Sequence, residues 1–150
     1  MRTLCIVTCG KRKIWDKFPD TGPTEARYVY IGPLAKKCME YAERFYQTSW
    51  RILSAKYGFL LPDDVIPHNY NVSFSDPLTN PITVAELSAQ VRSRGYDKCE
   101  EIIVLAGMKY SEIVREAFGG RSIFNPLSDC SGNGYMMQRL KQAIDRGVPL

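Results

Sequence analysis

Basic and aromatic side chains follow small residues at four places in this chain, and each place comes directly after a short apolar run. The four segments are Cys9-Gly10-Lys11-Arg12-Lys13, Ser54-Ala55-Lys56-Tyr57-Gly58, Ala106-Gly107-Met108-Lys109-Tyr110 and Asn125-Pro126-Leu127-Ser128. Glycine lets a ligand approach the backbone closely, lysine attracts phosphate, and tyrosine offers a ring on which a base can stack. This combination is typical of a site for a flat anion, such as a nucleotide or a nucleic acid.

Two adjacent carboxylates, Asp63 and Asp64, follow the second of these segments, and Asn69 and Tyr70 come shortly after them. A carboxylate beside a flat ligand can orient a water molecule or stabilise an oxocarbenium-like sugar cation. The alternative is a turn in which the aspartates accept hydrogen bonds from nearby backbone N–H groups. Both interpretations remain open at the level of the sequence.

The elements that must position these side chains alternate between strands and helices. We predict strands at Thr3–Thr8, Trp50–Leu53, Glu101–Ala106 and Ser122–Asn125 from their short apolar runs. Helical patterns begin at Pro33, after Thr83 with its capping-box Glu86, at Ser111 and at Gly134. Right-handed crossovers then predict one α/β domain over residues 1–150, a three-layer α/β/α sandwich with a four-stranded parallel sheet in the order 2-1-3-4.

Parallel strands place their carboxyl ends on one edge of the sheet, where ligands bind. We therefore expect one crevice lined by ligand-binding residues from all four strand exits, namely Cys9, Lys11, Lys13, Ser54, Tyr57, Asn69, Tyr70, Gly107, Tyr110 and Asn125. The candidate catalytic residues are Asp64, Asp63 and Lys56, and Lys11 and Lys56 would hold phosphate.

Three further segments bear on this crevice. Residues 9–27 and residues 56–80 are rich in Pro, Gly, Asp and Asn and are expected to be a long loop and an irregular rim. Gly132-Asn133-Gly134 opens the last predicted helix, where backbone N–H groups and the helix dipole could hold a phosphate. The alternative there is a plain turn that uses glycine for a positive φ.

The charge is unevenly distributed along the 150 residues. The net charge is +4, yet no Lys or Arg occurs from Tyr57 to Val91, where Asp63, Asp64 and Asp76 lie. Basic residues instead cluster at 11–13 and recur after the later strands. This distribution fits a basic rim for phosphates, although most charge clusters are simply solvated surface.

The five cysteines have no C-x-x-C spacing, and His68 is the only histidine, so we expect neither a metal site nor a cofactor. Cys5, Cys38 and Cys99 are expected to be small buried apolar residues, whereas Cys9 and Cys130 fall in turns at the crevice. No apolar run is long enough for a membrane span, and no signal-peptide pattern is present. We therefore expect a cytoplasmic protein with no membrane partner.

Several of these segments together carry a family resemblance. The chain contains Tyr30-Ile31-Gly32-Pro33-Leu34-Ala35-Lys36, the run Ile52-Leu53-Ser54-Ala55-Lys56-Tyr57-Gly58 continuing to Leu60-Leu61-Pro62-Asp63-Asp64-Val65-Ile66, then Val104-Leu105-Ala106-Gly107, and Asn125-Pro126-Leu127. In these motifs the chain resembles a family of small prokaryotic and phage proteins. That family is in turn distantly similar to the core domain of archaeosine synthase and to the uracil-DNA-glycosylase-like fold.

The resemblance implies a four-stranded α/β/α sandwich and chemistry on nucleobases. Asn125-Pro126-Leu127-Ser128 is similar to the H-P-S-P-L-S loop of uracil-DNA glycosylases, with Asn125 in place of its histidine, and no G-Q-D-P-Y follows the first strand. The turn after the first strand has Lys11 and Lys13 but lacks the Pro and Tyr of the lysine motif of archaeosine synthase.

Three functions are consistent with these features. The first is an N-glycosidase-type hydrolase or base transferase acting on a nucleobase in a nucleic acid or nucleotide, with Asp64 activating water. The second is a non-catalytic nucleotide- or nucleic-acid-binding module. The third is a lysine-centred transferase of modified-base metabolism in which Lys11 or Lys56 is the nucleophile. A carboxylate in the crevice would favour the first function, and only basic residues and tyrosines there would favour the second.

Overall fold

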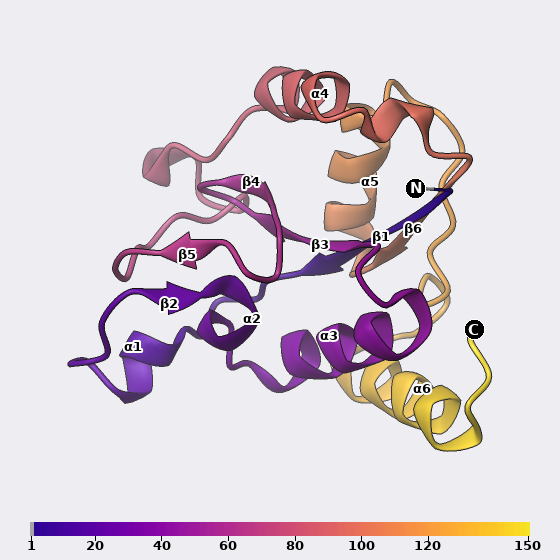
Figure 1. Cartoon of the computed structure of the whole chain (residues 1–150), viewed down its shortest axis with the longest axis horizontal. Helices are drawn as coiled ribbons and strands as arrows, with labels where there is room; N and C mark the ends of the chain where they lie inside the picture. Colours follow the sequence, from indigo (N-terminus) through magenta and orange to yellow (C-terminus); the bar gives the residue numbers. More distant parts are fainter. Residues whose placement is uncertain (1) are drawn as a thin grey trace.

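A four-stranded sheet forms the middle layer of the molecule, in the order β4-β3-β1-β6 (Figure 1). The structure, a computed structural model, describes residues 2–150. Its elements are β1 (Thr3–Thr8), α1 (Ile14–Lys17), β2 (Thr24–Glu25), α2 (Ala26–Val29), α3 (Pro33–Tyr46), β3 (Trp50–Ser54), β4 (Gly58–Leu60), β5 (Val65–Ile66), the short 3-10 helix η1 (Pro77–Thr79), α4 (Val84–Ser93), a second 3-10 helix η2 (Tyr96–Lys98), β6 (Glu101–Leu105), α5 (Met108–Ala117) and α6 (Asn133–Arg146).

Helices cover both faces of the sheet because β1 is apolar on both sides. Cys5 and Val7 point into a core shared with α3 and α6, whereas Leu4 and Ile6 point into a second core shared with α4 and α5. Figure 1 shows the two helix pairs on opposite sides of the strands. The predicted three-layer α/β/α architecture is therefore confirmed.

The strand directions agree with the prediction for three strands. β1 runs parallel to both β3 and β6, with Cys5 opposite Trp50 and Ile103. The carboxyl ends of these three strands consequently share one edge of the sheet, the left edge in Figure 1.

The prediction that Ser122–Asn125 is the fourth strand was wrong in extent. Only Phe124 pairs with β6, as one parallel bridge to Ile103, because Pro126 has no N–H to continue the ladder. The fourth strand of the sheet is β4, which is antiparallel to β3. Gly58 makes this hairpin possible: its φ is +79°, and an added Cβ would lie 2.4 Å from the Gln90 side chain.

The segments predicted as a long loop and an irregular rim contain secondary structure of their own. β2 pairs with β5 in a small antiparallel sheet beside the carboxyl edge of the main sheet. Trp15 of α1 is buried and donates its indole N–H to the carbonyl of Thr21 at 2.7 Å. These contacts hold residues 9–30 and 61–66 together over the end of the sheet.

The predicted helix boundaries hold where they rest on capping chemistry. The Thr83 hydroxyl accepts the Glu86 N–H at 3.1 Å, which confirms the capping box at the start of α4. Gly147 ends α6 in the left-handed region, with a φ of 69°. Both signals are local, so neither depends on the tertiary fold.

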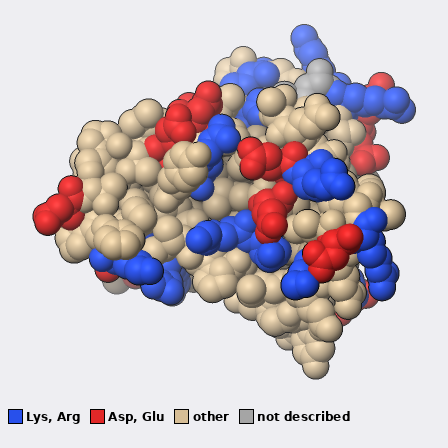
Figure 2. Space-filling view, turned by 60° about the horizontal axis from the view of Figure 1, so that its bottom comes forward, with Lys and Arg blue, Asp and Glu red and all other residues tan. Residues whose placement is uncertain are grey.

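Much of the charge is ordinary solvated surface. Figure 2 shows Lys and Arg interleaved with Asp and Glu on the side of the molecule that is lowest in Figure 1. Lys37 pairs with Glu40 on α3, and Lys141 pairs with Asp145 on α6. In residues 2–150, no helix combines the length and apolar character needed to cross a membrane, and no three His, Cys, Asp or Glu residues gather where they could hold a metal ion.

Candidate functional site

Two adjoining hollows lie at the carboxyl edge of β1, β3 and β6. The first, which we call the inner pocket, measures about 160 Å³ and lies between the turn after β1, Ala55 and residues 70–79. The second, the outer groove, measures about 520 Å³ and lies between the same turn, residues 32–35 and residues 107–110. Gly10, Lys11 and Tyr110 line both, so the two hollows form one crevice.

The turn after β1 divides the crevice because its backbone is fixed at both ends. Gly10 has a φ of +68°, and a Cβ added there would approach that of Ala35 to 3.8 Å, so the turn packs directly on the start of α3. At its far end, Lys13 forms an antiparallel bridge with Tyr30, and the Arg12 carbonyl accepts the Ile31 N–H at 3.1 Å. The turn thus presents Lys11 and Arg12 outward and Lys13 inward.

Lys13 is a buried lysine at the inner pocket, with only 6% of its surface exposed. Its ammonium donates to the Lys11 carbonyl at 3.1 Å and lies 4.4 Å from the centroid of the Tyr70 ring. Burial lowers the pKa of Lys13, while the nearby Asp16 carboxylate acts in the opposite direction. Among the described residues, no carboxylate lies within ion-pair distance of the Lys13 ammonium.

The Asp16 carboxylate accepts hydrogen bonds from the turn after β1 and from the rim of the crevice. It accepts the backbone N–H of Lys13 at 2.8 Å and the side-chain amide of Asn69 at 3.2 Å. These hydrogen bonds lower the pKa of Asp16, the one from the Lys13 backbone having the largest effect. Asp16 therefore orients the turn after β1 while its carboxylate stays ionised.

Cys9 is buried against the inner pocket and carries a neutral thiol. Burial raises its pKa to about 11, although the nearby Lys13 ammonium works against the increase. A thiol that stays protonated near neutral pH is a poor nucleophile. The prediction that Cys9 lies at the crevice is confirmed, whereas Cys130 lies away from it beside Tyr135 and Arg139.

A chain of hydroxyl groups anchors Tyr70 beside Lys13. The Ser54 hydroxyl oxygen lies 2.9 Å from the Tyr70 hydroxyl and accepts the backbone N–H groups of Lys56 and Tyr57. The Tyr70 hydroxyl is also hydrogen-bonded to that of Tyr30. Burial raises the pKa of Tyr70 to about 12. Ser54 is therefore a fully buried support for Tyr70 and does not line the crevice itself.

Lys56 and Tyr57 flank the same ring from outside the pocket. The Lys56 ammonium lies 5.5 Å from the Tyr70 ring centroid and is exposed. Tyr57 packs edge-on against Tyr70, with ring centroids 5.3 Å apart. Asn69 lines a third hollow beside the inner pocket, together with Lys11, Lys13 and Asp16.

Residues 71–79 form the outer wall of the inner pocket and are held by their own hydrogen bonds. The Thr79 hydroxyl donates to the Asp76 carbonyl at 2.6 Å and accepts the Ser73 N–H at 3.0 Å. Asp76 accepts the Leu78 N–H with one carboxylate oxygen, which caps the 3-10 helix η1. The Asp76 side chain therefore has a fixed position at the pocket, and it lies on the same wall as Ser73 and Ser75.

The outer groove is lined by the N-termini of three long helices. In the described residues, four helices have ten or more residues, and α3, α5 and α6 begin at Gly32, Gly107 and Gly132 with no side-chain cap. Only α4 caps itself, through Thr83. Residues 32–35, 107–110 and Asn133 all line the groove, so the uncapped N–H groups of the three helices open at one place.

The electrostatics of the outer groove favour an anion. Lys11, Arg12 and Lys109 line it, and no Asp or Glu does. Each helix N-terminus stabilises a nearby anion by about 0.3–1 kcal/mol at an exposed site. The phosphate interpretation of Gly132-Asn133-Gly134 therefore agrees with the position of Asn133, and Gly132 is extended, with a φ of 177°, so the positive-φ alternative is wrong.

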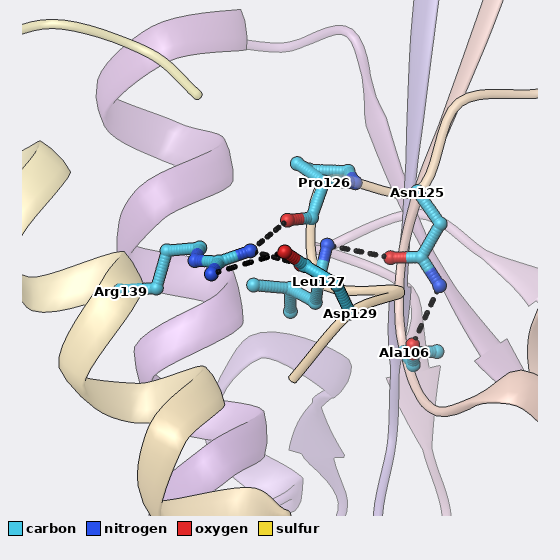
Figure 3. A network of polar contacts seen from close by, with 6 residues as sticks. All are labelled: Ala106, Asn125, Pro126, Leu127, Asp129 and Arg139. Atoms are coloured by element: carbon cyan, nitrogen blue, oxygen red, sulfur yellow. Dashed lines mark hydrogen bonds and ion pairs between the residues drawn. The ribbon is translucent and has the colours of Figure 1, made fainter. Parts of the chain in front are cut away.

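Asn125 links the end of β6 to the loop that precedes α6, beneath the crevice. Its side-chain amide donates to the Ala106 carbonyl at 2.8 Å and accepts the Leu127 N–H at 3.0 Å (Figure 3). Arg139 of α6 donates to the Pro126 carbonyl and pairs with Asp129. Each polar atom of the buried Asn125 amide thus has one partner inside the protein, and Asn125 lies beneath the two hollows without lining either of them.

Asp63 and Asp64, the predicted catalytic carboxylates, lie outside the crevice. The Asp64 carboxylate accepts the Leu61 N–H at 2.8 Å, and its backbone carbonyl accepts the Ala26 N–H. Asp63 lines a separate hollow with Arg27, Trp50 and Pro62. The turn interpretation is therefore confirmed for Asp64. The sequence could not distinguish the two because β4 carries the chain away from the strand exit before Asp63.

Of the predicted ligand-binding residues, Cys9, Lys11, Lys13, Asn69, Tyr70, Gly107 and Tyr110 line the crevice or the hollow beside it. The prediction did not include Asp76, which lines the inner pocket, or the start of α3 at residues 32–35, which lines the outer groove. The turn-forming residues from Ser73 to Thr79 were recognisable in the sequence as part of an irregular rim. Which of the carboxylates in that rim lines the pocket depends on the tertiary fold. Pro33 marks the first position of α3 in the sequence, and Gly32 before it has no side chain that could cap the helix.

Comparison with known proteins places the chain in a family. Residues 4–142 match DUF6884, described as a family of unknown function, and the chain belongs to that family. It is similar to the Uncharacterized protein YfjM of Bacillus subtilis (strain 168), with 41% identity over 146 residues and 97% of each chain covered. No solved structure matches this chain.

Proposed function

We propose that the protein is an N-glycosidase-type hydrolase or base transferase that acts on a nucleobase in a nucleotide or nucleic acid. The observation that carries the proposal is the adjacency of two hollows with different chemistry. The outer groove offers Lys11, Arg12, Lys109 and three uncapped helix N-termini to phosphate. The inner pocket, reached past Gly10, has the size of a cavity that accepts a single flat ring, since about 150 Å³ holds benzene.

The inner pocket also contains the groups that glycosidic bond cleavage needs. Asp76 lies on its wall and could orient water or stabilise a sugar cation, the role expected of Asp64 from the sequence. Tyr70 and Tyr110 give aromatic surface for the base. The order β3-β1-β6, with Phe124 beyond β6, agrees with the 2-1-3-4 order of the uracil-DNA-glycosylase-like fold, and this likeness is part of the proposal, as is action in the cytoplasm.

A non-catalytic nucleotide-binding module is a second candidate, favoured by the position of Asp63 and Asp64 outside the crevice. Only Asp76 and Asp16 bring carboxylates to the inner pocket and the adjoining hollow, and Asp16 is occupied by the Lys13 backbone and Asn69. A lysine-centred transferase, the third function considered from the sequence, would use Lys13, because Lys11 and Lys56 are exposed to water.

The experiment that tests the proposal measures base release. Purified protein is incubated with mononucleotides and single-stranded oligonucleotides, and free base is quantified by reversed-phase chromatography. Asp76→Asn should retain ligand binding and lose turnover, because the amide still caps η1 but cannot serve as a base. Asp63→Asn is the matched control and should keep full activity. Binding without base release by the wild type would instead establish the binding module.

A further inference from the structure

The inner pocket contains a buried lysine whose amine has one hydrogen-bond acceptor in the protein. Lys13 Nζ carries three protons when charged and two when neutral, and the protein supplies the Lys11 carbonyl and the face of the Tyr70 ring. Within residues 2–150, no carboxylate oxygen forms an ion pair with it. A buried donor without a partner is unfavourable, so the pocket favours a ligand that completes the set.

The remaining walls of the pocket do not supply that acceptor. Thr79 Oγ1 bonds the backbone of Ser73 and Asp76, and Ser73 Oγ bonds Ser75 Oγ, so these hydroxyls are engaged within their own wall. The Cys9 thiol stays protonated, as its pKa is raised to about 11 by burial. The further acceptors for Lys13 are therefore water or a ligand, and a ligand that displaces the water must supply an acceptor in its place.

We infer that Lys13 makes the inner pocket selective for nucleobases with an oxo group at the position that faces its ammonium, C4 of a pyrimidine or C6 of a purine, over bases with an amino group at that position. This inference depends on the proposed function, since it assumes that a nucleobase enters the pocket. An exocyclic carbonyl oxygen accepts a hydrogen bond from Lys13 whether the amine is charged or neutral. An exocyclic amino group at that position places a donor against the Lys13 donor, and Lys13 would have to move to reach the neighbouring ring nitrogen instead.

The Tyr70 ring fixes where the oxo group must lie. The aromatic face lies 4.4 Å below Lys13 Nζ, and its hydroxyl is held by Ser54 and Tyr30. Lys13 is therefore clamped by the Lys11 carbonyl on one side and by the ring on another, which limits the directions in which its free N–H can point. Such a fixed donor discriminates more strongly than a flexible surface lysine would.

The test compares matched nucleotides by isothermal titration calorimetry. The pairs are inosine and adenosine 5′-monophosphate, and uridine and cytidine 5′-monophosphate, because each pair shares its phosphate and differs at one exocyclic oxo or amino group and at the proton of the adjoining ring nitrogen. The oxo member should bind at least about tenfold more tightly, as expected when a buried donor is left unmatched by the amino member.

Two variants identify the residue responsible. Lys13→Met keeps the apolar stem without the donor and should reduce the preference to within about twofold, whereas Lys13→Gln retains an N–H and should keep part of it. Lys17→Met removes an exposed lysine of α1 as the matched control and should leave the preference unchanged.

The possible results distinguish failure of the selectivity from failure of the proposed function. Equal affinity within both pairs in the wild type, or tighter binding of the amino members, overturns the selectivity while the proposed function stands. A wild-type preference that persists in Lys13→Met overturns the assignment to Lys13. If none of the four nucleotides binds, the inference is wrong, and the proposed function is wrong as well if the oligonucleotides of the base-release assay also fail to bind.

Discussion

The Lys13 ammonium lies 4.4 Å from the centroid of the Tyr70 ring, and this contact joins the turn after β1 to the segment that closes the inner pocket. The two residues are far apart in sequence and come together only because the small β2–β5 sheet folds over the carboxyl edge of the main sheet. A buried cation on an aromatic face gains about 2 kcal/mol or more when desolvated, which partly offsets the loss of hydration. The part of the lost hydration energy that this contact does not offset lowers the pKa of Lys13, and the first prediction follows from it.

The stability of the wild type relative to Lys13→Met should increase as the pH rises from 7 towards 10. Burial lowers the pKa of Lys13 in the folded state, whereas in the unfolded chain it has the ordinary value of about 10.4. Between the two values the unfolded state binds the extra proton, so the free energy of unfolding rises with pH, and the penalty for the buried charge is greatest below the folded-state pKa. Urea unfolding of both proteins at several pH values measures the difference. A difference that is constant with pH would show that Lys13 titrates normally.

Gly107→Asp should make the protein more stable and weaken nucleotide binding at the same time. Gly107 is the N-cap of α5, with a φ of −67° and a ψ of 169°, and a Cβ added there meets no atom within 4 Å. An aspartate can therefore cap the helix, for a gain of a few tenths of a kcal/mol. Its carboxylate would also occupy the anion position of the outer groove, which should raise the Kd for uridine 5′-monophosphate about tenfold.

The control for that variant is Thr83→Asp at the start of α4, which exchanges one good cap for another away from the groove. Thermal unfolding and calorimetric titration of both variants give the two readouts. Unchanged binding by Gly107→Asp would mean that the phosphate does not lie at α5.

Asp64→Ala should destabilise the fold by about 1 kcal/mol and leave ligand binding unchanged. The Asp64 carboxylate accepts the Leu61 N–H at 2.8 Å, and a hydrogen bond of this kind contributes roughly 0.5–1.5 kcal/mol. Asp63→Ala is the matched control, because the exposed Asp63 side chain makes no hydrogen bond among the described residues, and it should be nearly neutral. Urea denaturation measures the free energy of unfolding of both variants. Loss of turnover in Asp64→Ala with no loss of stability would show that Asp64 takes part in catalysis.

The comparison of Asp64 with Lys13 shows what the sequence could predict. The strands of β1, β3 and β6 were readable because each is a short apolar run bounded by turn residues, and their parallel direction placed Cys9, Gly107 and Tyr110 at one edge. The chain beyond Ser54 was not readable in this way. Gly58, Phe59 and Leu60 form too short a run to distinguish a strand from a loop, and that strand diverts Asp63 and Asp64 from the crevice.

The burial of Lys13 was likewise invisible in the sequence. Lys11, Arg12 and Lys13 are three consecutive basic residues, and nothing local marks the third as the one that turns inward. The distinction arises from the bridge between Lys13 and Tyr30, a tertiary contact across the segment that was predicted as a loop. The hydrogen bond of Asn125 could not be read from the sequence for a similar reason, because its partner Ala106 directly follows a different strand.

Asn125→Ala should lower the free energy of unfolding by about 1–3 kcal/mol. The substitution leaves the Ala106 carbonyl and the Leu127 N–H without their partner in a buried region, and an unsatisfied buried group costs an amount of this size. Arg139→Ala, which removes a partly exposed side chain of α6 that bonds the same loop, should cost less than half as much. Urea denaturation of the two variants provides the comparison, and similar costs would contradict the central role given to Asn125 in the loop.

If the ligand is a nucleic acid, its binding should weaken steeply with salt, because each phosphate that the protein neutralises releases counterion. The cations that line the outer groove are Lys11, Arg12 and Lys109, whereas Lys13 is turned inward. Replacing these three residues by Ala should therefore flatten the slope of log affinity against log salt by about two to three units for a single-stranded oligonucleotide. Lys37→Ala and Lys141→Ala remove cations that pair with Glu40 and Asp145 along their own helices, and a double variant of this kind should keep the wild-type slope. Fluorescence anisotropy with a labelled oligonucleotide from 50 to 300 mM salt gives the slopes. An equal loss of slope in the control variant would place the phosphates elsewhere on the surface, and a flat wild-type slope with measurable mononucleotide binding would restrict the substrate to free nucleotides.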